Sequence, residues 1–266
     1  MPMTHVGFYA EADKLERLVY RASLVAAMRS KSEGVVGVMI TASSRKNDMN
    51  GLKLIDGDGN LWSGHWMNVV ELIVNTVDLD YSIRNLGEAS IRGFPTSSDM
   101  FGHEPVRPPL PKAQTLEEME ETKGDEPPIV LPHVMVTADT RSSSPALLDK
   151  VKHGLESMRA PYTVVDKVTK PQFSYLIKNH ALNATVDAYV NGYCDLFLDF
   201  VALADVKRRS YERTLLVDCA NGLAAFHLPH VSARLREKLT IMLMNKRTAE
   251  HARLNDECGV EWVLKT

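Results

Sequence analysis

Hydrophobic and polar positions follow two periods along this chain, one typical of helices and one of strands. Between residues 11 and 30, apolar side chains recur every three or four positions and charged side chains fill the opposite face, which predicts an amphipathic helix. The run from Val35 to Ile40 contains no polar side chain, which predicts a strand buried on both faces of a sheet flanked by helices. Asn50-Gly51 is a turn signal, after which residues 52–55 are expected to be extended.

A strand–helix–strand pattern follows in the middle of the chain. Strands are expected over 134–137 and 162–165, joined by a helix that begins at Ser144-Pro145 and ends near residue 158. Such a unit predicts a parallel strand pair with a right-handed crossover. Ligands bind at the carboxyl ends of parallel strands, so Ser43 and the Asp139–Arg141 loop, which both follow strands, are expected to face one crevice.

The pattern repeats towards the end of the chain and predicts a second α/β unit. A helix is expected over 183–207, then a strand over 215–218, a helix, and a strand over 240–244. We therefore divide the chain into residues 1–184 and residues 185–266. Eight of the 13 prolines and an acidic run lie between residues 92 and 132, which predicts a surface insertion in the first domain.

Composition excludes several classes of protein. The chain has 266 residues and a formal net charge of −3, so no general basic field attracts nucleic acid. Three cysteines without a CxxC pair fit reduced thiols. No apolar run approaches the roughly 18 residues that a membrane-spanning helix needs, and the amino terminus lacks the pattern of a secretory signal. We expect a cytoplasmic protein without a membrane or nucleic-acid partner.

The small hydroxyl residues after the first buried strand are the candidate chemistry. A strand that delivers Ser43 to its carboxyl end is a common way to present a nucleophile in an α/β protein. A serine hydrolase is disfavoured, because the chain has no Gly-x-Ser-x-Gly elbow and no histidine placed as its base.

Several segments together resemble the amino-terminal half of the phosphoacetylglucosamine mutases, a branch of the α-D-phosphohexomutase family. The resemblance covers nearly the whole chain apart from the proline-rich insertion. It is carried, in the order of the family, by Val38–Ser43, Asn50–Leu54, Asp139–Arg141 with the serines that follow, Thr169–Gln172, Val217–Gly222 and Leu254–Gly259. It implies a three-layer α/β/α first domain of the phosphohexomutase type and an incomplete second domain of the same kind.

The resemblance also implies an activity and its residues. It implies an isomerase (an intramolecular phosphotransferase) that interconverts N-acetylglucosamine 6-phosphate and 1-phosphate through a phosphoserine, in UDP-N-acetylglucosamine biosynthesis. Ser43 would carry the phosphate, Lys53 would lie beside it and assist proton transfer, and Arg141 would bind the phosphosugar substrate. Magnesium would bridge the phosphate on Ser43 and offset its charge.

The chain departs from the family where positive charge is needed. The three motif residues after the serine are replaced here by Ser44, Arg45 and Lys46. An active-site arginine near the amino terminus is replaced by Tyr9, and a Gly-Arg pair is replaced by Thr137-Ala138. The family's metal-binding Asp-Gly-Asp-x-Asp-Arg loop and its third and fourth domains do not occur in this sequence. We therefore expect no mutase turnover by this chain alone, and no stoichiometric phosphate on Ser43 after incubation with a hexose 1,6-bisphosphate.

The alternative hypothesis is a non-catalytic α/β interaction module that keeps the mutase scaffold. Ser43 and Ser44 would then be loop hydroxyls and Lys53 a surface lysine. An incomplete second domain over 185–266 would leave apolar surface exposed, which predicts self-association through that domain.

Overall fold

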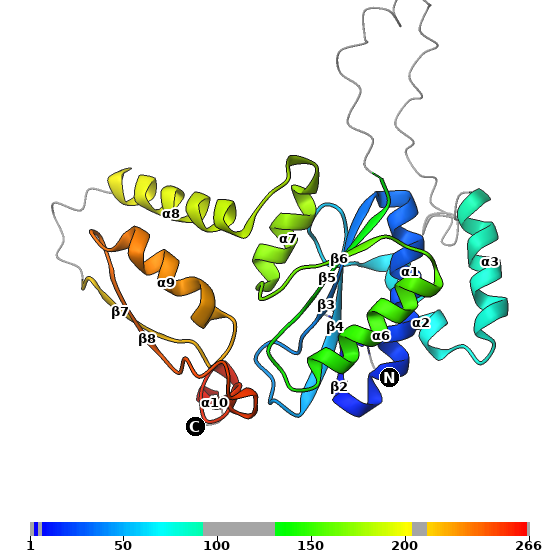
Figure 1. Cartoon of the computed structure of the whole chain (residues 1–266), viewed down its shortest axis with the longest axis horizontal. Helices are drawn as coiled ribbons and strands as arrows, with labels where there is room; N and C mark the ends of the chain where they lie inside the picture. Colours follow the sequence, from blue (N-terminus) through cyan, green and yellow to red (C-terminus); the bar gives the residue numbers. More distant parts are fainter. Residues whose placement is uncertain (1–2, 5–6, 93–130, 204–211, 265–266) are drawn as a thin grey trace, which may run out of the picture.

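The computed structural model describes residues 3–4, 7–92, 131–203 and 212–264 (Figure 1). Most of the predicted proline-rich insertion, residues 93–130, lies outside the described residues. The described residues form two sheets with helices packed against them, which confirms the predicted α/β class. None of their helices is both long and apolar enough to cross a lipid bilayer.

The larger sheet is mixed and has six strands in the order β1-β2-β4-β3-β5-β6. Their bounds are Met3–Thr4 (β1), Gly7–Glu11 (β2), Val35–Ile40 (β3), Met49–Ile55 (β4), His133–Ala138 (β5) and Tyr162–Val164 (β6). Strands β3, β5 and β6 run parallel, whereas β4 runs antiparallel to both β3 and β2. The predicted parallel pair of β5 and β6 is confirmed, and β3 is buried at every position, as its sequence indicated.

Helices cover both faces of this sheet (Figure 1). One face packs against α1 (Glu16–Glu33), α2 (Gly64–Asn75) and α6 (Ser144–Ser157), with a large core around Val36, Val38 and Ile40. The other face packs against α7 (Lys170–Lys178) through a smaller core. Three further elements flank these layers, namely the short helices η1 (Ala12–Lys14) and η2 (His180–Leu182) and helix α3 (Leu79–Arg92).

The Asn50-Gly51 pair lies inside strand β4, so the expected turn at this position is wrong. The side chain of Asn50 is buried, and its amide nitrogen donates hydrogen bonds to the hydroxyls of Ser143 and Ser144 at 2.9 and 3.2 Å. A Cβ atom on Gly51 would lie 2.5 Å from the carbonyl oxygen of Phe8 and 2.7 Å from that of Thr41. Glycine is therefore needed here for close backbone packing rather than for a turn.

The smaller sheet pairs β7 (Thr214–Asp218) with β8 (Thr240–Met244) in parallel. Helices α8 (Val186–Leu203) and α9 (Ala224–Leu235) pack on each other around Val190, Cys194 and Leu235, and two short helices follow, η4 (His251–Arg253) and α10 (Val260–Val263). The predicted strand–helix–strand order is confirmed in this region. The division of the chain at residue 184 stays a prediction.

Candidate active site

The loop that follows β3 presents Ser43 in an unusual backbone conformation. Ser43 has a φ of 53°, in the left-handed region that residues with a side chain adopt rarely and that concentrates at functional sites. Its backbone N–H donates to Thr41 Oγ1 at 3.0 Å, and the hydroxyl of Thr41 donates to Asp139 Oδ2 at 2.8 Å. Because β3 and β5 are parallel neighbours, Thr41 and Asp139 follow the two strand ends side by side, and this places Ser43 and the Asp139–Arg141 loop at the same edge of the sheet.

Lys53 reaches the same serine from the neighbouring strand. It lies opposite Met39 in the antiparallel β3–β4 pair and is 9% exposed. Its Nζ donates a hydrogen bond of 2.7 Å to Ser43 Oγ. Burial lowers the pKa of Lys53 below 10.5, and the positive charge of Lys170 lowers it further, against the opposing effect of Asp139. The structure thus brings Ser43 and Lys53 together, while their catalytic roles stay a prediction.

Arg141 lies beneath the serine loop and is 1% exposed. All five N–H groups of its guanidinium have acceptors. Nε donates to Asp139 Oδ2 at 3.0 Å, Nη1 to the carbonyls of Lys46 and Met49, and Nη2 to those of Ser43 and Arg45. The predicted substrate-binding role of Arg141 stays untested. This geometry favours a supporting role, because a contact with substrate would require one of these bonds to break.

The carboxylates beside the serine are also engaged within the protein. Asp139 accepts hydrogen bonds from Thr41, Arg141 and Ser144, and Asp218 accepts them from two backbone N–H groups and from Asn245. Across the described part of the chain, no three His, Cys, Asp or Glu side chains gather into a group that could hold a metal ion. Magnesium at Ser43 therefore stays an implication of the family resemblance.

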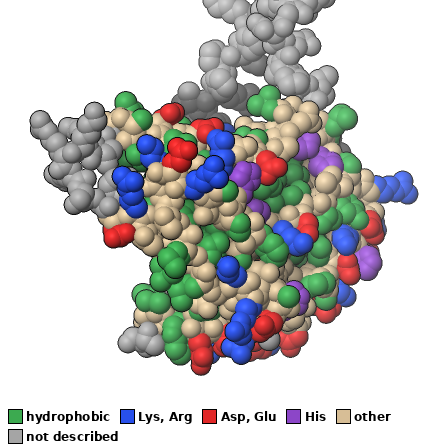
Figure 2. Space-filling view, turned by 60° about the vertical axis from the view of Figure 1, so that its left-hand side comes forward, with side chains coloured by type: hydrophobic (Ala, Val, Ile, Leu, Met, Phe, Trp, Pro, Cys, Tyr) green, Lys and Arg blue, Asp and Glu red, His purple; other side chains and the backbone are tan. Residues whose placement is uncertain are grey.

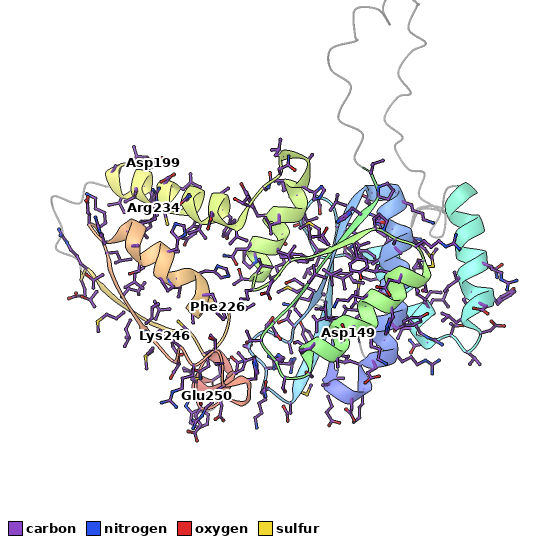
Figure 3. The ribbon with its side chains drawn as sticks, viewed as in Figure 1. Asp149, Asp199, Phe226, Arg234, Lys246 and Glu250 are labelled. Atoms are coloured by element: carbon purple, nitrogen blue, oxygen red, sulfur yellow. The ribbon has the colours of Figure 1, made fainter. Side chains whose placement is uncertain are left out.

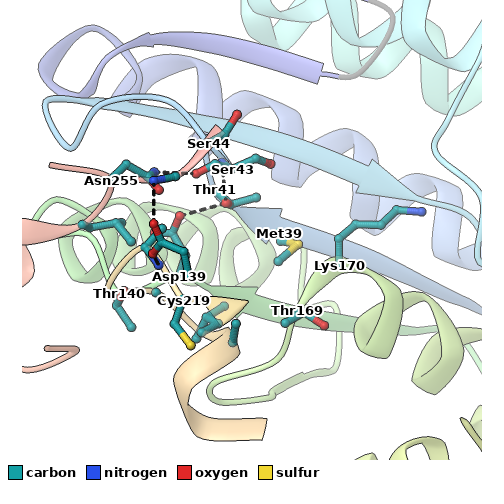
Figure 4. A pocket seen from close by; sticks show the side chains of 17 residues that line it. Met39, Thr41, Ser43, Ser44, Asp139, Thr140, Thr169, Lys170, Cys219 and Asn255 are labelled. Carbon is teal, nitrogen blue, oxygen red and sulfur yellow. Dashed lines mark hydrogen bonds between the residues drawn. The ribbon is translucent and has the colours of Figure 1, made fainter. Parts of the chain in front are cut away.

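A pocket of about 320 Å³ opens beside these residues (Figure 4). Ser43, Ser44 and Asp139 line one side of it, and Thr169 and Lys170 at the start of α7 line another. The remaining side comes from the second part of the chain, with Asp218, Cys219, Ala220, Gly222, Leu223, Ala224, Leu254, Asn255 and Gly259. Segments that the sequence analysis matched separately to the family thus meet around one cavity.

Two of the departures from the family motif contact each other. The guanidinium of Arg45 lies over the ring of Tyr9, 5.2 Å from its centroid, which is within cation–π distance. Burial raises the pKa of Tyr9, and the charge of Arg45 partly offsets that rise. Arg45 is exposed and lies in the same loop as Ser43. The loop therefore carries a cation of its own beside the serine, held by an aromatic side chain.

Sequence reasoning missed three residues of the site. Thr41 and Lys170 were read only as parts of motifs, although Thr41 directly follows β3 and Lys170 begins α7 at the pocket. Asn255 donates from its side chain to the carbonyls of Ser43 and Arg45, 212 and 210 residues away. The only signal for Asn255 was its place in the matched segment Leu254–Gly259.

Among known proteins, the chain is similar to phosphoacetylglucosamine mutases over nearly its whole length. No protein-family model matches the chain. It is 26% identical over 263 residues to phosphoacetylglucosamine mutase from Sus scrofa, covering 97% of this chain and 42% of the relative. It is 27% identical over 271 residues to phosphoacetylglucosamine mutase 1 from Schizosaccharomyces pombe, covering 97% and 45%. The chain thus spans less than half the length of these curated relatives.

Solved structures show the same fold. The substrate complex of an N-acetylglucosamine-phosphate mutase matches with a TM-score of 0.74 and 22% identity, over 99% of this chain and 45% of that one. The Aspergillus fumigatus N-acetylphosphoglucosamine mutase, in complex with GlcNAc-6P and magnesium, matches with a TM-score of 0.71 and 24% identity, over 100% and 44%. The fold is that of the amino-terminal part of the α-D-phosphohexomutases. Within that class, the chain is a distant homologue of phosphoacetylglucosamine mutase over its amino-terminal half.

Proposed function

We propose that this chain is the serine-loop half of a phosphoacetylglucosamine mutase-type site, working on N-acetylglucosamine phosphates in the cytoplasm as part of UDP-N-acetylglucosamine biosynthesis. One observation carries the proposal. Lys53 Nζ lies 2.7 Å from Ser43 Oγ beside an open pocket. A nucleophile and a base within hydrogen-bond distance are what phosphoryl transfer to a serine requires.

The proposed step moves one phosphoryl group from a hexose bisphosphate to the protein. Ser43 Oγ attacks phosphorus, so that a new P–O bond forms as the bond to the sugar oxygen breaks. Neutral Lys53 takes the hydroxyl proton of Ser43, and the released sugar oxygen takes a proton from water. The lowered pKa of Lys53 increases the fraction of neutral amine near physiological pH.

We further propose that this chain does not complete the mutase cycle by itself. Transfer of phosphate from a dianionic donor needs positive charge placed where the negative charge develops. The described residues contain no group of three His, Cys, Asp or Glu side chains that could hold a metal ion, Tyr9 replaces the family's arginine, and the guanidinium of Arg141 is fully engaged with the loop. The positioned charge that remains is that of Lys170 and Arg45.

The expected result with purified chain, N-acetylglucosamine 6-phosphate and magnesium is no detectable turnover in a coupled mutase assay. With glucose 1,6-bisphosphate we expect phosphorylation at least about 100-fold slower than that of the Sus scrofa relative assayed alongside, because one lost electrostatic group costs about that much. Intact-mass measurement should show a minor phosphorylated fraction, which Ser43→Ala abolishes and Ser44→Ala retains.

Two outcomes would contradict different parts of the proposal. If no phosphorylated fraction forms at any bisphosphate concentration, Ser43 is not a phosphoryl carrier. If phosphorylation through Ser43 is stoichiometric and as fast as in the relative, the described residues are sufficient for the transfer, and the chain is not limited to half of the site.

A second candidate function, an interaction module, is favoured by the apolar surface of the second part. Along α8, one stripe packs on α9, while a second apolar stripe of Tyr193, Leu196, Phe200 and Leu203 is exposed. One face of the β7–β8 pair is also exposed, at Leu216 and Met242. Figure 2, which turns this part forward, shows hydrophobic side chains in several patches on the surface. An apolar stripe on a helix is normally packed against another element.

A second copy of the chain is the occupant that we propose for this surface. Within the described residues, β7 and β8 pair only with each other, so each has an open edge. An open strand edge is self-complementary about a two-fold axis, and the apolar stripe of α8 lies on the same part of the chain. The same patch on both copies would then cover itself in a symmetric dimer.

We therefore expect the purified chain to dimerise at concentrations of about 10–100 µM, the range of weak interfaces. Sedimentation velocity should show a dimer that the double variant Leu196→Glu, Phe200→Glu converts to monomer. The matched control is Val77→Glu, which replaces an isolated apolar side chain that is 97% exposed and should leave the dimer intact. A wild-type monomer throughout this range would contradict the proposal, and so would equal loss of dimer in the control.

A further inference from the structure

Two carbonyl groups of the serine loop each accept hydrogen bonds from two different side chains. The carbonyl oxygens of Ser43 and Arg45 both accept hydrogen bonds from Arg141 Nη2, each at 2.9 Å. The same two oxygens accept from Asn255 Nδ2, at 2.9 and 2.8 Å. Figure 4 shows Asn255 directed towards Ser43. A carboxamide nitrogen has two N–H groups, so one asparagine can serve both carbonyls.

The two donors come from different parts of the chain. Arg141 follows β5 in the six-stranded part, whereas Asn255 follows η4 in the second part. Asn255 is itself fixed in place, because its backbone N–H donates to the carbonyl of Ala220 at 3.0 Å and its neighbour Leu254 is buried. The serine loop is thus held by Arg141 of the six-stranded part and by Asn255 of the second part.

The conformation that these bonds stabilise is one that Ser43 does not adopt readily by itself. A serine with a φ of 53° lies in the sparsely populated left-handed region, so the surrounding contacts must hold it there. Directing the carbonyls of Ser43 and Arg45 towards Asn255 fixes the peptide plane that follows each of these two residues. The direction of Ser43 Oγ towards Lys53 depends on the same backbone.

Other hydrogen bonds join the two parts without touching these carbonyls. His227 Nε2 lies 2.6 Å from the carbonyl oxygen of Lys167, and His251 Nδ1 lies 2.6 Å from that of Thr140. Near the start of α9, Phe226 lies on the side that faces the first part, with Lys167 Nζ 5.3 Å from its ring centroid (Figure 3). Docking of the second part and clamping of the serine loop are therefore separable by mutation.

We infer that Asn255 is a positioning residue for Ser43, and that docking of the second part fixes the serine loop in the conformation that presents Ser43 to Lys53. The inference rests on the proposed function only for its catalytic consequence, since the clamp itself is a property of the loop. A loop without this clamp would sample other conformations, in which Ser43 Oγ leaves Lys53.

Limited digestion of the native chain with trypsin tests the clamp directly, because Arg45 and Lys46 are exposed residues of the loop that trypsin recognises. Cleavage of a native loop requires local opening, so its rate reports how firmly the loop is held. Asn255→Asp keeps the shape of the side chain but replaces both donors with an acceptor facing two carbonyls. We expect cleavage after Arg45 and Lys46 to be about tenfold faster in Asn255→Asp and Asn255→Ala, with thermal midpoints close to that of the wild type.

Two control variants separate the clamp from general effects. Asp256→Asn changes charge at the next position, which is exposed, and should leave cleavage within about twofold of the wild-type rate. His227→Ala removes a contact between the two parts away from the serine loop and should have less effect than Asn255→Asp. Wild-type cleavage in both Asn255 variants, or equal acceleration in His227→Ala, would overturn the inference.

A second readout connects the clamp to the serine. The residual phosphorylation of Ser43 by glucose 1,6-bisphosphate should fall about tenfold in Asn255→Asp, in step with the faster cleavage. A faster cleavage with unchanged phosphorylation would show that Asn255 holds the loop without positioning the serine, which overturns the inference. If the wild type is not phosphorylated at all, the proposed function fails, while the digestion still decides whether Asn255 clamps the loop.

Discussion

Replacing Arg141 with methionine is expected to lower the free energy of unfolding by about 3–5 kcal/mol, the range for removing one partner of a buried ion pair. Methionine approximates the length of the arginine stem but donates no hydrogen bond. The variant leaves the carboxylate of Asp139, which is 8% exposed, without its cation. It also removes the guanidinium bonds to four loop carbonyls, and although those of Ser43 and Arg45 keep Asn255 as a donor, the lost bonds add to the cost.

Urea denaturation followed by circular dichroism measures this effect as a shift in midpoint at constant slope. Arg141→Lys should recover only part of the loss, because an ammonium group cannot reproduce the planar fork that serves both sides of the loop. The control is Arg253→Met, which removes an exposed side chain with ion pairs of 3.6 and 3.9 Å and should stay within about 0.5 kcal/mol of the wild type. An Arg141→Met variant as stable as this control would mean that the guanidinium does not support the loop.

The sheet around the site was predictable from local sequence where burial dominates. Val35–Ile40 is apolar throughout, and such a run predicts a strand that helices cover on both faces of the sheet. The turn predicted at the neighbouring Asn50-Gly51 is wrong, because a dipeptide that favours a tight turn also suits a strand where other backbone atoms pack closely. Its conformation is decided by Phe8, by Thr41 and by the serines at the start of α6, and of these only Thr41 is near in the sequence.

The contacts between site residues were harder to predict from the sequence. Ser43 and Lys53 were linked through the family resemblance, whereas their contact depends on the register that sets Lys53 opposite Met39. The residue type does not show that the side chain of Arg141 points beneath the serine loop. An arginine at a strand end is as suited to bind substrate as to support a loop. Asn255 contacts a loop 212 residues earlier, and no periodicity or spacing encodes such a contact.

The largest catalytic effect is expected at Lys53. If Lys53 is the base for Ser43, Lys53→Met should reduce phosphorylation of Ser43 from radiolabelled glucose 1,6-bisphosphate by about 100-fold or more, the usual contribution of a positioned general base. Lys53→Arg should be almost equally impaired, because a guanidinium keeps the positive charge but does not accept a proton. Activity close to wild type in Lys53→Arg would assign Lys53 an electrostatic role and would contradict proton transfer.

The pH dependence gives the second test of Lys53, because only the neutral amine accepts a proton. Burial and the charge of Lys170 lower the pKa of Lys53, so the wild-type rate should rise with pH through a midpoint below 10.5, and Lys53→Met should lose this rise. Lys170→Met removes a cation that disfavours the charged form, so the pKa of Lys53 should increase and the midpoint should move to higher pH. A midpoint that stays unchanged in Lys170→Met would indicate that another group titrates, and Lys53 would then not be the base that activates Ser43.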